Sequence, residues 1–168
     1  MQHRLRACAL LLVLPCLATP GLCDGRKSLH GLQGVAVHVS VDVPAAIREY
    51  CDSVTIQTRT ELKLRQYGVR ILSDDEEFLV PGKPSLYVSL LGVSSSEGTL
   101  YAISVRVVVN QFLLREPKLT PSAVFADTWS SASVLMYGTE TVKGGKVYET
   151  VADQCDEFVN DWLAEHGK

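Results

Sequence analysis

The segments Leu86-Tyr-Val-Ser-Leu-Leu91 and Tyr101-Ala-Ile-Ser-Val-Arg-Val-Val-Val109 decide the fold, because both are rich in the branched and aromatic residues that favour β-strands. The polar stretch Ser94-Ser-Ser-Glu-Gly98 lies between them, and its Glu-Gly pair is typical of the turn of an antiparallel hairpin. A third strand is expected over residues 123–136, after a loop at 117–121 that contains two prolines. The centre of the domain is therefore predicted to be an antiparallel meander.

A long amphipathic helix is predicted to follow this meander, after glycines at 138, 144 and 145. Its apolar residues recur at spacings of three or four positions and form one stripe, made of Val147, Val151, Cys155, Phe158 and Trp162. Its acidic residues fall mostly on the opposite, solvated side: Asp153, Asp156, Glu157 and Asp161. Such a helix has to bury its apolar stripe against the sheet.

Upstream of the meander, the chain is predicted to form a strand, a helix and a second strand. Residues 34–41 alternate valine with small or polar residues, which indicates a half-buried strand. A helix is expected to begin near Asp42 and Pro44, to bury Ile47, Cys51, Val54, Thr58 and Leu62, and to end at Gly68. The short apolar segment 69–72 is the second strand, and such a unit usually has parallel strands.

The whole pattern predicts an α+β fold, in which a mixed sheet carries two helices on one face. Residues 24–168 show no repeat and no internal linker, so they are expected to form a single domain. Between the two halves, Ser73 and Glu76 have the spacing of a capping box, which predicts a short turn of helix.

The first 23 residues are predicted to be a secretory signal peptide. Arg4 and Arg6 precede an apolar run of about 11 residues, which is too short for the roughly 20 that a membrane-spanning helix needs. Two cleavage sites compete, one after Ala18 and one after Cys23, and the second is favoured because it follows a Pro-Gly break. The exported protein is then expected to begin at Asp24 and to work in the periplasm or outside the cell.

The composition argues against several classes of partner. Neither Cys16 nor Cys23 is preceded by the small residue that lipid attachment requires, so a lipid anchor is disfavoured. Removing the two arginines of the signal lowers the net charge from −3 to −5, and the remaining basic residues are scattered among acids. No nucleic-acid partner is therefore expected, since such proteins cluster lysine and arginine. No later segment is apolar and long enough to predict a transmembrane span.

Four stretches resemble a widespread family of uncharacterised exported bacterial proteins, over nearly the whole chain after the signal. They are Leu64-Arg-Gln-Tyr-Gly-Val-Arg-Ile-Leu72, Pro84-Ser-Leu-Tyr-Val88, Thr128-Trp-Ser130 and Asp156-Glu-Phe-Val-Asn-Asp-Trp-Leu163. This resemblance implies export but no activity. The element order is more distantly similar to the envelope fold of the TolB amino-terminal domain and of the penicillin-binding-protein activator LpoB, a likeness of topology that implies no function.

No motif for catalysis or metal binding is evident, so no catalytic residue, cofactor or metal ligand is assigned. His38 is expected to lie on the face of its strand opposite the valines, as a surface or hydrogen-bonded histidine. The acidic run 74–77 lacks the pattern of a calcium loop and fits a capped helix start. In 128–131, the tryptophan is expected to pack under a helix while the serines face water.

Cys51 and Cys155 both fall on the apolar sides of their predicted helices. If the two helices cover one face of the sheet, an oxidising compartment could join these residues in a disulfide. Two separately buried thiols are the equally weighted alternative.

These observations favour an exported, envelope-associated binding or accessory protein that is not an enzyme and that engages an envelope protein. The alternative is a hydrolase-like enzyme whose site is assembled from distant residues. The candidate residues for such a site are Ser130, His38 and one acidic residue.

Overall fold

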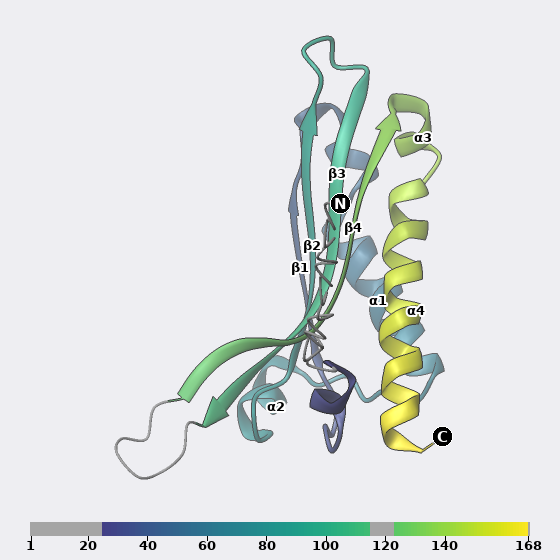
Figure 1. Cartoon of the computed structure of the whole chain (residues 1–168). Helices are drawn as coiled ribbons and strands as arrows, with labels where there is room; N and C mark the ends of the chain where they lie inside the picture. The colour runs from purple at the N-terminus through teal and green to yellow at the C-terminus, as the bar shows by residue number, and fades with distance from the viewer. Residues whose placement is uncertain (1–24, 115–122, 168) are drawn as a thin grey trace, which may run out of the picture.

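Four strands form one mixed sheet in the computed structural model, which describes residues 25–114 and 123–167 (Figure 1). In spatial and sequence order they are β1 (Ala36–Asp42), β2 (Ser85–Ser94), β3 (Leu100–Leu114) and β4 (Ala123–Gly138). Strands β1 and β2 are parallel, and the other two pairs are antiparallel. The α+β fold class and the predicted meander are confirmed, while the predicted signal peptide lies outside the described residues.

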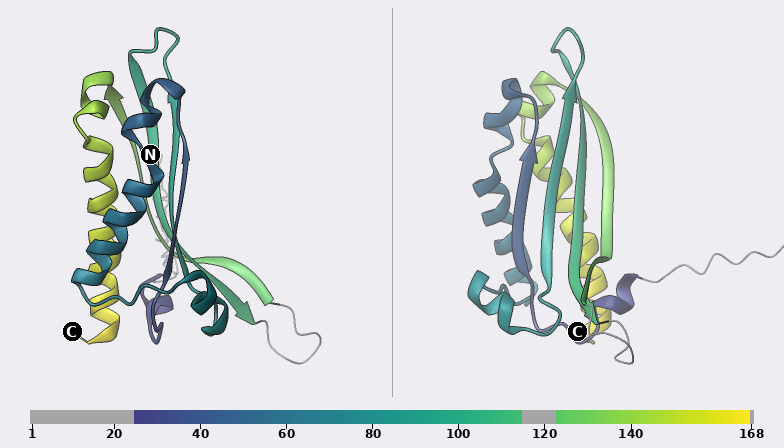
Figure 2. Two further views of the ribbon diagram at one scale, coloured as in Figure 1. Left: turned by 180° about the vertical axis from the view of Figure 1, so that it is seen from behind. Right: turned by 90° about the vertical axis from the view of Figure 1, so that its left-hand side faces the viewer.

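Two long helices, α1 (Ser53–Gln66) and α4 (Lys146–His166), pack against the sheet on the same side (Figures 1 and 2). The remaining elements are short: η1 (Gly25–Leu29), η2 (Ala45–Tyr50), α2 (Asp74–Leu79) and α3 (Thr139–Lys143). In the right-hand view of Figure 2 the other face of the sheet points toward the viewer, with both long helices behind it. Among the described residues, no helix combines the length and the apolar character that a membrane crossing requires.

The core lies between α4, α1 and the covered face of the sheet. Every residue of the predicted α4 stripe is buried, from Val147 to Trp162. The Phe158 side chain is fully enclosed, with its ring edge-on to Trp129 at 5.3 Å and tilted to Trp162 at 5.8 Å between ring centroids. The sheet contributes alternate apolar residues to this core: Leu86, Val88, Leu90, Ile103, Val105, Val107 and Val109.

The prediction of one continuous helix from Asp42 to Gly68 is wrong in its first half. The 3-10 segment η2 comes first, and α1 begins only after Asp52, whose carboxylate accepts a hydrogen bond from the Thr55 amide at 2.7 Å. Because the helix is interrupted at Asp52, α1 buries a different face from the one that a continuous helix starting at Asp42 would bury. Three members of the predicted stripe, Val54, Thr58 and Leu62, are exposed, whereas Ile56, Thr60 and Leu64 are buried.

The segment 69–72 is not a full strand of the sheet. It makes one parallel bridge, in which the Val35 amide donates to the Arg70 carbonyl and the Leu72 amide donates to the Val35 carbonyl. Glycine at position 68, with φ at 78°, ends α1 as predicted. The capping box also forms, since Ser73 and Glu76 each accept the backbone hydrogen bond that the motif requires.

Truncating the Phe158 side chain should destabilise the protein, because the loss of a fully enclosed ring leaves a cavity between α4 and β4. Phe158→Ala is expected to lower the free energy of unfolding by about 3 to 5 kcal/mol. Urea denaturation measures this loss, with the exposed Leu62→Ala on α1 as the matched control, for which a change below about 0.5 kcal/mol is expected. Equal losses in both variants would contradict the packing described above.

Candidate functional site

The structure does not bring together the residues that the sequence analysis named for a hydrolase. His38, Tyr87, Val108 and Ser130 form one row across the four strands, with His38 and Ser130 at opposite edges of the sheet. Three strand spacings separate the two outer residues by about 14 Å. A histidine acting as general base needs hydrogen-bond reach to its serine, and this row does not provide it.

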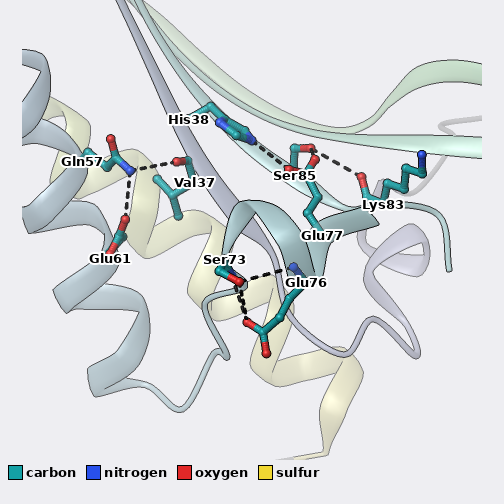
Figure 3. A network of polar contacts seen from close by, with 9 residues as sticks. All are labelled: Val37, His38, Gln57, Glu61, Ser73, Glu76, Glu77, Lys83 and Ser85. Atoms are coloured by element: carbon teal, nitrogen blue, oxygen red, sulfur yellow. Dashed lines mark hydrogen bonds and ion pairs between the residues drawn. The ribbon is translucent and has the colours of Figure 1, made fainter. Parts of the chain in front are cut away.

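His38 instead lies beside α2, as Figure 3 shows. Its Nε2 atom is 3.2 Å from a carboxylate oxygen of Glu77, and the other oxygen of Glu77 accepts a hydrogen bond from the Ser85 hydroxyl. Ser85 is only 2% exposed, and its hydroxyl points to the carboxylate and not to the imidazole. The Glu77 carboxylate thus docks α2 onto β1 and β2, and His38 is hydrogen-bonded as expected.

The acidic run 74–77 forms the capped first turn of α2, as predicted. Arg70 donates to the Glu76 carboxylate at 2.6 Å. The backbone of Ser73 and the Arg70 guanidinium together lower the pKa of Glu76. The capping interaction is therefore present at neutral pH and is lost only in acid, as the pH falls through this lowered pKa. Among the described residues, no group of acidic, histidine and cysteine side chains is suited to hold a metal ion.

Trp129 packs beneath α4 and Ser130 faces water, as predicted, whereas Ser131 is half-buried and its hydroxyl donates to Glu157 of α4. The indole Nε1 of Trp129 donates to Asp161 on α4 at 2.9 Å. Cys51 and Cys155 are free, buried thiols in this structure, and the disulfide stays a prediction. Burial raises the pKa of Cys155 to about 11 and that of Cys51 in the same direction, so both thiols are protonated and weakly nucleophilic at neutral pH.

A cleft of about 440 Å³ lies between α1 and the start of α4, with buried Ile56, Val151 and Cys155 among its lining residues. Its basic side chains are engaged within the chain. Lys63 pairs with Asp156 at 2.6 Å, Lys143 pairs with Glu140 at 3.1 Å, and the Arg59 guanidinium lies 4.6 Å from the centroid of the Tyr148 ring. We therefore interpret the cleft as part of the contact region between α1 and α4, in which polar side chains pair with one another.

The most unusual surface belongs to the distal part of the β3–β4 hairpin, residues 110–114 and 123–127, here named the arm. A register shift between Val109 and Asn110 marks its start, and from there it bends away from the sheet (Figure 1). Phe112 pairs with Phe125 across the arm, with ring centroids 4.9 Å apart, and the two residues are 40% and 50% exposed. Leu113 and Val124 form the next cross-strand pair and are also exposed.

The base of the arm is firmly positioned. Gln111 is buried, and its side-chain amide donates to the Ser28 carbonyl at 3.1 Å and to the Thr128 hydroxyl at 2.7 Å. The Phe112 amide donates to the Gly82 carbonyl at 2.7 Å. These bonds tie the arm to η1 and to the loop that follows α2.

Helix α2 adds to the same apolar surface. The Lys83 ammonium lies 4.7 Å from the centroid of Phe78 and 5.4 Å from that of Phe112, so one cation bridges the helix and the arm. Phe78 and Leu79 are both strongly exposed. We name the set on this side of the arm, comprising Phe78, Leu79, Lys83, Phe112 and Phe125, the aromatic surface, whereas Leu113 and Val124 point to the other side of the arm.

Comparison of the chain with protein-family models and with curated proteins finds no match to either. The proposed function therefore rests on the geometry of the surfaces described above.

Glu77→Ala should release α2 from the sheet, because it leaves the buried Ser85 hydroxyl without its carboxylate acceptor. A cost of about 1 to 3 kcal/mol is expected for such a buried group. Hydrogen exchange followed by mass spectrometry should show faster exchange in residues 74–79, with little change in α4. Asp75→Ala, which removes an exposed charge from the same helix, is the control. Unchanged exchange in the Glu77 variant would show that this carboxylate does not hold α2.

Proposed function

We propose that this chain is an exported, envelope-associated binding or accessory protein that engages a partner protein through its aromatic surface. The observation that supports this proposal is the exposure of paired phenylalanines on a hairpin that projects from the folded domain. Contiguous exposed apolar residues mark interaction sites on soluble proteins. Aromatic side chains are also enriched where protein interfaces derive most of their binding energy.

The way in which the arm is held supports recognition by a preformed surface. Its base is fixed by the Gln111 and Phe112 hydrogen bonds, and Glu77 fixes the neighbouring helix. Less conformational freedom is then lost when a partner binds, which improves affinity without further contacts.

The chemistry of the surface indicates the kind of partner. Lys83 contacts aromatic rings and has no ion pair within the described part of the chain. A partner with apolar side chains beside a carboxylate would cover the phenylalanines and neutralise this cation. The excess of acidic residues over basic ones disfavours an anionic membrane as the alternative occupant.

Site-specific photo-crosslinking in an envelope fraction of the source cells tests this proposal. A photoreactive phenylalanine analogue at Phe125 should give a discrete protein adduct, and the same analogue at exposed Leu62 on α1 should not. Adding Phe112→Ser to the Phe125 probe should reduce the adduct severalfold, because the apolar contact beside the probe is lost.

Three outcomes would contradict the proposal: no adduct at Phe125, the same adducts at both positions, or a Phe125 adduct that extracts with lipid. The melting temperature of each variant should stay close to that of the parent, since the substituted side chains are exposed.

A further inference from the structure

Among residues 25–114 and 123–167, no strand pairs with the outer edge of β4, so this edge of the sheet is open. At Thr128, just after the arm, the Ser28 hydroxyl donates to the backbone carbonyl at 2.9 Å and covers the edge there. From Ser130 to Met136, the backbone hydrogen bonds within the described residues run only to β3. The opposite edge, on β1, is partly covered. The Val37 carbonyl accepts from the Gln57 side chain at 3.2 Å, and Val35, the residue just before β1, bridges to Ile71.

The open edge has none of the features with which soluble proteins usually prevent unwanted strand pairing. Residues 129–137 read Trp-Ser-Ser-Ala-Ser-Val-Leu-Met-Tyr, without a charge or a proline. Edge strands are normally protected by lysine, proline, a bulge or a covering element. The open stretch of β4 is therefore suited to receive an added strand.

The two sides of this edge have opposite character. On the face away from the helices, Val134 and Met136 are 71% and 73% exposed. On the helix side, α4 carries an acidic row at intervals of four residues: Glu149, Asp153, Glu157 and Asp161. Glu157 accepts from the Ser131 hydroxyl at 2.5 Å, and Asp161 accepts from the Trp129 indole at 2.9 Å, so the row runs alongside β4.

Cations form ion pairs with the two ends of the acidic row, and the Lys146 ammonium also interacts with Asp153 at longer range. Glu149 pairs with Lys146 at 2.6 Å, and Asp161 lies 4.0 Å from the Arg26 guanidinium. For Asp153 and Glu157, the described residues supply no ion pair. Both residues are exposed.

We infer that the open β4 edge and the acidic row form a docking site for an extended segment of a partner protein in which apolar and basic residues alternate. Side chains of an added strand point to opposite faces of the sheet in turn. Those on one side would pack on Val134 and Met136, and those on the other would face Asp153 and Glu157. The inference rests on the proposed function only in taking the partner to be a protein.

A second copy of this chain fits the edge less well. Pairing two β4 edges would place the acidic row of one copy beside that of the other, and like charges disfavour such an approach. A basic segment gains from the same charges.

Binding of blocked peptides to the chain lacking residues 1–23 tests this inference. A peptide of alternating valine and lysine should bind in isothermal titration calorimetry and should protect the amides of residues 130–136 from exchange. Asp153→Asn with Glu157→Gln should weaken binding about fivefold, the effect expected from two exposed ion pairs. The control, Asp74→Asn with Asp75→Asn on α2, changes the net charge equally and should leave the affinity unchanged.

Equal binding of a valine–glutamate peptide, or equal weakening in the control variant, would overturn the inference, as would protection outside β4. A dimer in analytical ultracentrifugation that the peptide cannot dissociate would assign the edge to a second copy instead. Phe112→Ser, which alters the aromatic surface, should keep full peptide affinity. Failure of the aromatic surface and failure of this edge are therefore separately observable.

Discussion

The burial of the α4 stripe against one face of the sheet is the interaction on which the rest of the structure depends. Phe158 lies between Trp129 of β4 and Trp162 of the same helix, so one enclosed ring joins the helix to the outer strand. Because α1 and α4 occupy the same face, the opposite face is covered among the described residues mainly by the short helix α2 at one end, and the outer edge of β4 pairs with no described strand. The interaction that builds the core thus also determines which surfaces can meet a partner.

Helix α4 has a second role on the flank that does not enter the core. The same 3.6-residue periodicity that aligns its apolar stripe also aligns the acidic row beside β4. Hydrogen bonds from Trp129 and Ser131 to Asp161 and Glu157 fix that row relative to the edge strand. The aromatic surface is independent of this helix, since it is built on the arm and on α2 and is held by Gln111 and Glu77.

Sequence periodicity predicted the elements that have one strongly buried side. The α4 stripe and the valine alternation of β1 were visible because burial is imposed by a single neighbouring layer. The same reasoning failed at Asp52, where a local side-chain cap interrupts the helix and changes which residues of α1 are buried. It also predicted a full strand at residues 69–72, where the chain forms only one β-bridge, between Val35 and Ile71.

The candidate surfaces could be predicted only in part. The acidic spacing of four was readable along α4, but its position beside β4 depends on how helix and strand pack in three dimensions. The arm depends on the register shift after Val109, which places Phe112 opposite Phe125 beyond the sheet, and strand propensity alone contains no such information. Similarly, the contact of His38 with Glu77 joins residues 39 positions apart.

Deletion of residues 147–168 is the most direct test of the central role of α4. Without the helix, the apolar face of β3 and β4 would be exposed to water. The cost is expected to exceed the roughly 5 to 15 kcal/mol by which domains are typically stable. Sedimentation and thermal melting of the truncated chain should therefore show aggregation and no cooperative transition. A monomer with an unchanged melting temperature would contradict this account, because the sheet would then be stable without the helix.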